Sequence, residues 1–424
     1  MDYFNEVDYL VFKKKMDNDI LDKFTKDALN EAFSNNTYRT LRTMETPESS
    51  HVKIRNAKVY TEHEQILLAS NSYLDLANIP ELKQAMAQAV LDWGTGSGGA
   101  RLTTGNKTPH EELENELAKF KGEDAAITFN TGYMANVGTI SALCGKNDII
   151  FSDALNHASI IDGIRLSRAK CIVYKHNDMA DLEHALRKVG AEATGNSQSP
   201  NAPKPKMLIV TDAVFSMDGD LANLPELLRI ARTYNSLLMI DEAHATGVIG
   251  RTGRGLAEHY NCKHADVTVG TLSKAIACEG GFVVGKKQLI EFLKNKSRSF
   301  IFTTAMSPAM AAGALNNLRF LANHPERVQQ LQENVKFFCE CLHHEGLCES
   351  TSPSAIVPII IGDEAAALEA SAMLLERGYV IPAIRYPTVA KGHARLRASL
   401  MATHTKEELQ TAAAVIAQVI KSKK

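Results

Sequence analysis

Residues 237–247 read LLMIDEAHATG, a short apolar run that ends at Asp241 and is followed by His244. Six runs of similar length share this character: AAITFN (125–130), DIIFSDA (148–154), AKCIVYK (169–175), KMLIVTD (206–212), DVTVGTL (266–272) and GFVVG (281–285). Helical patterns alternate with these runs from about residue 80 onward. Short apolar strands separated by helices predict βαβ units and a buried, mostly parallel sheet flanked by helices. The predicted fold class is therefore α/β.

The whole chain is predicted to have three parts. Residues 1–60 read as helices followed by an extended stretch, and residues 61–305 contain the predicted sheet. Residues 306–424 predict a smaller C-terminal α+β domain, because a long helical pattern, PERVQQLQENVKFFCECLHHEG, precedes the strand-like AIVPIIIGD and YVIPAI. Residues 190–205, GAEATGNSQSPNAPKP, are polar and rich in turn formers, and they predict a surface loop.

Composition excludes several classes of protein. The chain has 424 residues and a formal net charge of −2, which argues against a nucleic acid or an anionic membrane as its partner. No apolar run approaches the roughly 18 residues of a membrane helix. The N-terminus lacks the apolar segment of a signal peptide, so a cytoplasmic protein is expected. The seven cysteines are odd in number and widely spread, which predicts reduced thiols and no metal site.

Reactive side chains follow three of the predicted strands. Asp241 and His244 follow one, Thr271 and Lys274 follow another, and Asp212 and Ser216 follow a third. Ligands of parallel sheets bind beyond the carboxyl ends of the strands, so these side chains are expected to share one site. A lone lysine there is usually a surface residue, and a lone aspartate is usually a helix cap. Their occurrence together at strand ends of one sheet instead favours a catalytic site.

That combination suits pyridoxal 5'-phosphate (PLP). PLP needs an amine for its Schiff base and a carboxylate opposite its pyridinium nitrogen, and Lys274 and Asp241 supply these groups. Its phosphate needs hydroxyls and the backbone N–H groups of a helix start. FNTGYMAN (129–136) offers such a start at Gly132 and Tyr133, and Thr271 adds a hydroxyl.

Several longer motifs carry a resemblance to a known family: WGTGSGGARLTTGN, TGYMANVG, SDALNHASIIDGIRLS, TDAVFSMDGD, IDEAHATGVIG, GTLSKA, SFIFTTAMSPA and AIRYPTVAKGHARLR. From about residue 37 to near its end, the chain resembles the α-oxoamine synthases, a family of fold-type I PLP-dependent transferases. The resemblance implies a large PLP-binding domain, a small C-terminal domain and a homodimer. It also implies that an amino acid is joined to an acyl thioester with loss of carbon dioxide.

The resemblance implies roles for individual residues around the cofactor. Lys274 matches the Schiff-base lysine, which is also the acid and base at the substrate Cα, and Asp241 matches the partner of the pyridinium nitrogen. His157 matches the histidine that stacks on the ring and can reach the thioester carbonyl. His244 and Ser216 match residues beside the ring oxygen. Gly132, Tyr133 and Thr271 match phosphate ligands.

Four more residues match positions at the edges of the site. Thr303 and Thr304 match a segment that reaches the phosphate of the neighbouring subunit in this family. Asn71 and Arg397 match residues near the substrate carboxylate. An arginine suits that position, because its guanidinium group can pair with a carboxylate through two parallel hydrogen bonds.

Within the family, the motifs favour the branch that joins L-alanine to a pimeloyl thioester, carried by CoA or by a carrier protein, in biotin biosynthesis. The alternative is the glycine C-acetyltransferase reaction, in which glycine and acetyl-CoA give 2-amino-3-ketobutyrate. A non-catalytic paralogue acting as a subunit is a further alternative. The chain also departs from the family pattern at Ser72, Asp75, Cys278 and Tyr386. Asp75 replaces a glycine and is expected to need a left-handed backbone, which aspartate tolerates better than most residues.

Overall fold

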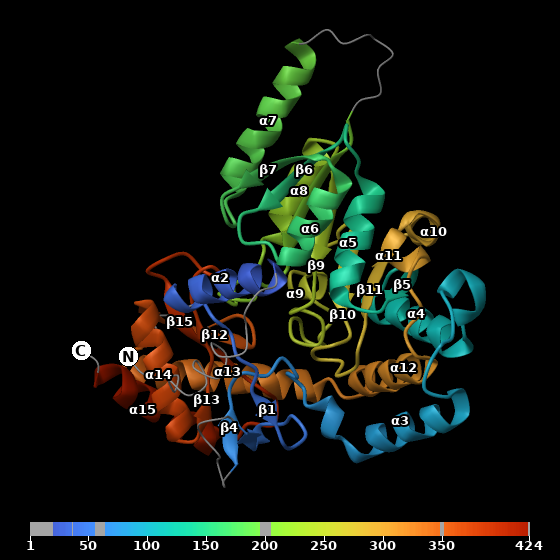
Figure 1. The fold of residues 1–424 in the computed structure, drawn as a ribbon. Helices are drawn as coiled ribbons and strands as arrows, with labels where there is room; N and C mark the ends of the chain where they lie inside the picture. The colour runs from blue at the N-terminus through green and yellow to red at the C-terminus, as the bar shows by residue number, and fades with distance from the viewer. Residues whose placement is uncertain (1–19, 36, 56–63, 196–204, 348–351, 423–424) are drawn as a thin grey trace.

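A seven-stranded sheet lies at the centre of the large part of the molecule (Figure 1). The computed structural model describes residues 20–35, 37–55, 64–195, 205–347 and 352–422. Across the sheet the strands are β5 (Ala125–Phe129), β11 (Gly281–Gly285), β10 (Val267–Thr271), β9 (Leu237–Asp241), β8 (Met207–Asp212), β6 (Ile149–Asp153) and β7 (Lys170–Tyr174). Strand β11 runs antiparallel to both neighbours, and the other neighbouring pairs are parallel. The predicted mostly parallel sheet is confirmed.

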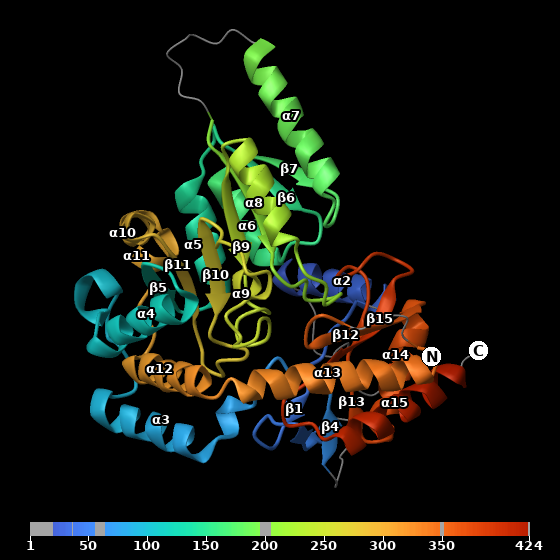
Figure 2. The same ribbon diagram turned by 180° about the vertical axis from the view of Figure 1, so that it is seen from behind.

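Helices cover both faces of this sheet (Figures 1 and 2). They are α4 (Thr108–Lys121), α5 (Gly132–Leu143), α6 (Ala158–Ser167), α7 (Met179–Gly195), α8 (Leu224–Thr233), α9 (Leu256–His259), α10 (Lys287–Lys296), α11 (Arg298–Ile301) and α12 (Pro308–Asn323). Side chains of β8 alternate between two apolar clusters: Leu208 and Val210 pack with α5, α6 and α10, and Ile209 packs in the cluster of α4, α7, α8 and α12. This burial on both faces explains why the strands read as continuous apolar runs.

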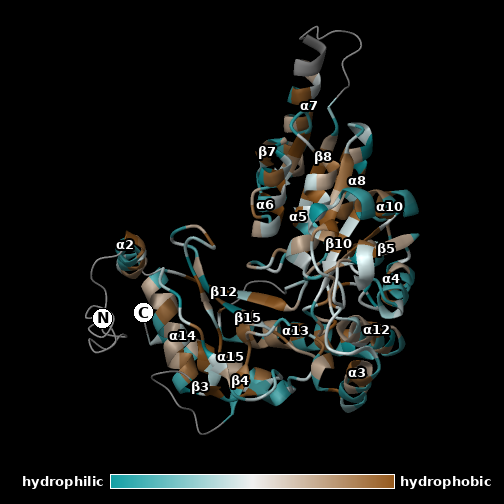
Figure 3. Cartoon of the chain, turned by 45° about the vertical axis from the view of Figure 1, so that its right-hand side comes forward, coloured by the Kyte–Doolittle hydropathy of each residue, from teal (hydrophilic) through white to brown (hydrophobic). Residues whose placement is uncertain are grey.

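The C-terminal part packs three helices against small sheets. These elements are α13 (Glu326–His344), β12 (Ile356–Gly362), α14 (Glu364–Glu376), β13 (Tyr379–Val380), β14 (Ala383–Ile384), β15 (Ala394–Ser399) and α15 (Lys406–Lys421). Strands β12, β15 and β14 form an antiparallel sheet, in which β12 is mostly apolar (Figure 3). In the described part of the chain no helix is long and apolar enough to cross a membrane.

The N-terminal elements contact both parts of the molecule. They are α2 (Ile20–Ser34), β1 (Thr43–Met44), β2 (His51–Val52), β3 (Ile54–Arg55), β4 (Gln65–Leu67), η1 (Leu76–Asn78), α3 (Pro80–Trp93) and η2 (Arg101–Gly105). Helix α3 packs against α12 of the large part (Figure 1). Strand β4 pairs with β13 in parallel and with β2 in antiparallel, so it joins segments more than 300 residues apart. The predicted domain boundaries at residues 60 and 305 stay predictions.

The predicted surface loop at residues 190–205 begins too early. Helix α7 continues through Gly195, because the alanines and the glutamate of GAEATG are strong helix formers. Residues 196–204 lie outside the described residues. The prediction of a loop is therefore wrong for residues 190–195.

A buried ion pair ties α4 to the segment that follows β9. The Lys121 ammonium pairs with the Glu242 carboxylate, and the two side chains are 1% and 4% exposed. Lys121 also donates to Thr246 Oγ1 at 3.1 Å and to the Arg254 carbonyl at 2.7 Å, and Glu242 accepts from the Leu256 N–H at 2.8 Å. Removing one partner of such a pair leaves the other charge buried without compensation.

We expect Lys121→Met to lower the free energy of unfolding by about 3–5 kcal/mol, measured by urea denaturation. Lys119→Met is the matched control, because Lys119 lies two residues away, is 80% exposed and pairs with Glu116 at 3.6 Å. A surface pair of that kind contributes less than about 1 kcal/mol. Equal effects of the two substitutions would show that the buried pair is not a stabilising element.

Candidate functional site

The site lies at the carboxyl ends of β8, β9 and β10. Asp212 and Asp241 end adjacent strands and face each other in register, and Val269 of β10 is the partner of Asp241 on the other side. Lys274 follows three residues after β10 ends. The structure thus gathers the predicted strand-end residues at one edge of the sheet.

The Lys274 amine is placed to react. Burial lowers its pKa, while the nearby carboxylates of Asp241 and Asp212 oppose this effect and the Arg397 guanidinium adds to it. Among the described residues, no hydrogen bond or ion pair engages its Nζ atom. A desolvated lysine with a lowered pKa has a larger neutral, nucleophilic fraction than an exposed one.

The Asp241 carboxylate is buried and held on both oxygens. Oδ2 accepts from Asn136 Nδ2 at 2.6 Å, and Oδ1 accepts from the Ala243 N–H at 2.8 Å. Each oxygen has a second lone pair, so the carboxylate can still accept a hydrogen bond from a ligand. A rigid, buried carboxylate of this kind suits a cationic ring nitrogen.

The start of α5 approaches Thr271 closely. Thr131 caps this helix through its hydroxyl, which accepts from the Met134 N–H at 3.1 Å, and the first N–H groups of a helix have no intrahelical acceptor. A Cβ atom on Gly132 would lie 3.1 Å from the Thr271 Cβ and 3.2 Å from its Oγ1. Glycine at position 132 therefore lets the backbone donors of the helix start approach Thr271, whose hydroxyl donates to the Gly280 carbonyl at 2.8 Å.

Two histidines lie beside the lysine. His244 Nδ1 is 2.7 Å from the Tyr73 hydroxyl, and burial together with the charges of Lys274 and Arg397 lowers the pKa of His244 well below its usual value. His157 is partly exposed, yet desolvation by surrounding protein lowers its pKa as well; the Asp241 carboxylate opposes this effect and the charge of Lys274 adds to it. Both imidazoles are therefore neutral near pH 7.

Arg397 of β15 reaches the site from the C-terminal part of the chain. It is 6% exposed, and it donates to the Ser216 carbonyl, to Ser399 Oγ at 2.7 Å and to Asn71 Oδ1 at 3.3 Å. The Tyr73 hydroxyl also donates to Asn71 Oδ1, at 3.1 Å. A guanidinium group has five N–H donors, so Arg397 keeps donors for a carboxylate.

Known proteins resemble this chain over almost its whole length. The family described as aminotransferase class I and II matches residues 63–416. An 8-amino-7-oxononanoate synthase from Lysinibacillus sphaericus is 47% identical, with 88% of this chain and 91% of the relative covered. Another, from Thermoanaerobacter pseudethanolicus, is 45% identical, with 92% and 94% covered. The chain belongs to the aminotransferase class I and II family.

Solved structures agree with this assignment. A lysine-to-alanine variant of serine palmitoyltransferase from S. paucimobilis, with a bound PLP–myriocin aldimine, matches with a TM-score of 0.85 and 30% identity, with 96% of this chain and 99% of that chain covered. Serine palmitoyltransferase is an α-oxoamine synthase, and the chain has the fold of that group within the aminotransferase class I and II family. It is a PLP-dependent C-acyltransferase.

The residues present fit PLP. An unpaired amine at Lys274, a buried carboxylate at Asp241 and the backbone donors of the α5 start at Gly132 supply the three groups that this family needs. We propose that Tyr133 adds a second backbone N–H, since its own hydroxyl is directed to Asp162. Among the described residues, no cluster of three or more His, Cys, Asp or Glu side chains could hold a metal ion.

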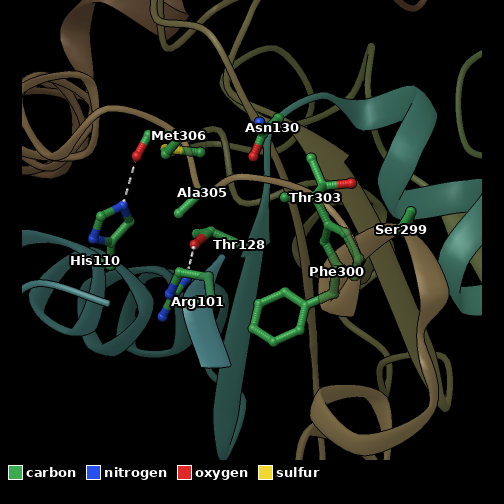
Figure 4. Close-up of a pocket in the computed structure, with 10 residues that line it drawn as sticks. Arg101, His110, Thr128, Asn130, Ser299, Phe300, Thr303, Ala305 and Met306 are labelled. Atoms are coloured by element: carbon green, nitrogen blue, oxygen red, sulfur yellow. Dashed lines mark hydrogen bonds between the residues drawn. The ribbon is translucent and has the colours of Figure 1, made fainter. Parts of the chain in front are cut away.

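Two predicted residues lie beside Asn130, just before the start of α5. Thr303 lines a small pocket with Arg101, Thr128 and Phe300 (Figure 4). Thr304 is exposed, and its carbonyl accepts from Asn130 Nδ2 at 2.9 Å. Their predicted contact with the phosphate of a neighbouring subunit stays a prediction, because the structure contains one chain. Ser216 is predicted to act through its side chain, whereas the contact observed here is through its carbonyl.

The departures from the family pattern have visible consequences. Asp75 has φ 53° and ψ 35°, so the expected left-handed backbone is confirmed, and it accepts from Asn78 Nδ2 at 2.6 Å. The Ser72 hydroxyl is buried and has no hydrogen-bond partner within the described residues. Cys278 is buried, and its sulfur accepts from Asn317 Nδ2 at 3.5 Å.

Sequence reasoning missed the residues that orient the site. Tyr73, Asn136 and Ser159 are buried and bonded to predicted site residues. Asp212 accepts from the His157 N–H at 3.1 Å. The sequence singles out Asp212 as a strand-end residue but gives it no role, whereas Tyr73, Asn136 and Ser159 lie inside motifs where nothing distinguishes them from core residues.

A charged histidine holds the segment that carries Ser216. His176 bonds Asp153 through Nδ1 and Asp220 through Nε2, both at 3.0 Å, and its ring packs edge-on against Phe215. Burial disfavours the charge, but these two carboxylates raise the pKa of His176 to about 10. The imidazolium therefore joins the ends of β6 and β7 to the segment between β8 and α8.

We expect His176→Gln to lower the free energy of unfolding by about 2 kcal/mol at pH 6. Because the folded pKa lies above the unfolded value of about 6.5, the stabilisation is full below about pH 6.5 and is lost as pH rises through about 10. The difference between wild type and variant should therefore shrink from pH 6.5 to 10 in urea unfolding. His184→Gln, an exposed change on α7, is the control, and a gap that stayed constant with pH would contradict the charged state.

Proposed function

We propose that this enzyme joins L-alanine to a pimeloyl thioester, releasing carbon dioxide and the thiol, to form 8-amino-7-oxononanoate for biotin biosynthesis. One observation carries the proposal. The Lys274 amine has no hydrogen-bond partner among the described residues, and it lies close enough to Asp241 and Arg397 for their charges to shift its pKa. The identity of 45–47% to enzymes named for this product supports the choice of branch.

Each residue has a distinct role in the proposed reaction. Arg397 and Asn71 bind the carboxylate of the amino acid, and this bidentate pairing turns the Cα–H bond toward Lys274. Lys274 removes the Cα proton and later returns a proton to the same carbon. When bound, PLP supplies the sink for the electron pair released at Cα, and Asp241 keeps the ring nitrogen protonated. His157 donates a hydrogen bond to the thioester carbonyl while the new C–C bond forms and the C–S bond breaks.

Burial also shields the charges of the site from water. Tyr73, Asp241 and Arg397 are each less than 10% exposed, so charges near the reacting carbon act with little screening by water. The neutral His244 adds no positive charge that would compete with the ring nitrogen for Asp241. The amino-acid end of the site is thus preorganised, whereas the thioester enters from the side of His157, the more exposed of the two imidazoles.

Substrate choice is tested by combining amino acids with acyl thioesters. Purified, PLP-loaded protein is mixed with L-alanine or glycine and with pimeloyl-CoA, a pimeloyl carrier protein or acetyl-CoA, and thiol release and product mass are followed. The proposal expects the highest kcat/KM with L-alanine and a pimeloyl thioester. A kcat/KM at least tenfold higher with glycine and acetyl-CoA would refute it in favour of the glycine C-acetyltransferase reaction.

We propose in addition that the enzyme works as a homodimer in the cytoplasm. Leu102 and Phe302 are 56% and 70% exposed, and they flank the backbone bridge between Ala100 and Thr304. Large exposed apolar side chains next to Thr304 support a second copy seated over this surface. Sedimentation equilibrium measures the mass in solution, and a monomer at micromolar concentration would contradict the dimer.

A further inference from the structure

Helix α6 begins with an unusual cap, the imidazole of His157. Its Nδ1 atom accepts the backbone N–H of Ser159 at 3.2 Å. A backbone N–H can only donate a hydrogen bond, so Nδ1 must present its lone pair. In a neutral imidazole the single proton then resides on Nε2.

A second donor acts on the same nitrogen. Ser159 Oγ is 2.7 Å from His157 Nδ1, and it also accepts from Asn136 Nδ2 at 2.9 Å. Because the Asn136 NH₂ group donates to the serine oxygen, the serine O–H is free to donate to Nδ1. Ser159 thus bonds the imidazole twice, through its backbone and through its side chain.

Asp241 fixes which groups donate and which accept in this series of hydrogen bonds. The same Asn136 NH₂ group donates to Asp241 Oδ2 at 2.6 Å, and turning the amide round would place its carbonyl against the carboxylate oxygen. Asn136 and Ser159 are each 1% exposed, so water does not compete for these bonds. The Asn136 carbonyl itself is buried without a partner in the described residues. This follows because the NH₂ group of the same amide is turned toward Ser159 and Asp241.

The groups around His157 also keep it neutral. The ring faces Lys274 and Asp241, its backbone N–H bonds Asp212, and the edge of Tyr133 lies 6.4 Å away between ring centroids. Desolvation lowers its pKa against the opposing Asp241 carboxylate, and Lys274 and the positive end of α6 act in the lowering direction. A proton on Nδ1 would break the bond from the Ser159 backbone N–H and would reverse the direction of the bond with the Ser159 hydroxyl.

We propose that Asn136 and Ser159 are positioning residues that hold His157 as the Nε2–H tautomer and connect it to Asp241. The inference rests on the proposed function, in which His157 faces the thioester. Only this tautomer presents a hydrogen-bond donor to the carbonyl oxygen, where negative charge develops as the new bond forms. The other tautomer would present a lone pair to that oxygen and repel it.

The tautomer can be observed directly. In ¹⁵N-histidine-labelled, PLP-loaded protein, long-range ¹H–¹⁵N spectra distinguish a protonated from an unprotonated ring nitrogen, and His157→Gln identifies the His157 signals. We expect an unprotonated Nδ1 and a protonated Nε2 in the wild type at pH 7. A protonated Nδ1 in the wild type would overturn the proposal without any variant being made.

Ser159→Ala removes one of the two donors. We expect this variant to show a mixture of tautomers, a His157 titration moved to higher pH, and a kcat about tenfold lower with an unchanged KM for the amino acid. Ser167→Ala is the matched control, since Ser167 lies on the same helix, is buried and donates to the Ile164 carbonyl at 2.7 Å. It should keep the wild-type His157 signals and kcat.

The two proposals fail differently. His157 signals in Ser159→Ala that matched the wild type in shift and titration would refute the positioning role. An expected tautomer in a protein that condenses no alanine with a pimeloyl thioester would instead refute the proposed substrate. The spectra thus test the positioning roles of Asn136 and Ser159 independently of turnover.

Discussion

A Lys274→Ala variant is expected to lose turnover by more than about 10⁴-fold and to lose the visible absorbance of lysine-bound PLP. Lys274 is both the attachment point of the cofactor and the proposed base at Cα, so one substitution removes two functions. Absorbance spectra and thiol release measure the two losses separately. Lys287→Ala, an exposed change at the start of α10, should leave both unchanged.

The fold of the Lys274→Ala protein should remain intact, because no hydrogen bond or ion pair of the described residues engages the Lys274 amine. Its unfolding midpoint in urea without PLP should therefore match that of the wild-type apoprotein. Condensation at a rate close to that of the wild type would show that another amine holds the cofactor. That result would remove the basis for every role assigned around Lys274.

Asp241→Asn is expected to lower the rate of Cα proton removal by about 10³-fold while PLP stays bound. Asparagine has the size of aspartate but carries no charge, so it cannot keep the ring nitrogen protonated. Its NH₂ group would also meet a donor, either Asn136 Nδ2 or the Ala243 N–H, where Asp241 accepts from both. Exchange of the alanine Cα proton for deuterium, followed by NMR, isolates this step.

Asp92→Asn is the control, because Asp92 is exposed on α3 and accepts a hydrogen bond from Gln88. It should exchange the Cα proton at the wild-type rate. Exchange that persisted undiminished in Asp241→Asn would contradict the role of Asp241. If the Asp241→Asn protein no longer binds PLP, the main role of Asp241 is to bind the cofactor and not to keep its ring nitrogen protonated.

The sheet could be predicted because burial on both faces leaves a clear pattern in the sequence. All seven apolar runs form the strands β5 to β11. The antiparallel direction of β11 could not be read from GFVVG, since an apolar run of five residues is equally compatible with either direction. The pairing of β4 with β13 was also beyond prediction, because each strand has three residues or fewer.

The reactive side chains of the site could be predicted because they follow strands, whereas their partners could not. Tyr73 and His244 are 171 residues apart in the chain and 2.7 Å apart in the fold. Asn136 and Ser159 are small polar residues within helices, where sequence alone suggests ordinary packing. Thr303 and Thr304 depend on a second chain, so neither the sequence nor one folded chain determines what they contact.

Glu242, the buried partner of Lys121, follows directly after Asp241 in the chain. One peptide bond therefore joins an anchor of the interior to the residue that faces the cofactor. Changes that loosen the interior near α4 should shift the colour of the holoprotein before the molecule unfolds. In directed evolution of this enzyme, yellow colour would thus report structural integrity and active-site geometry together.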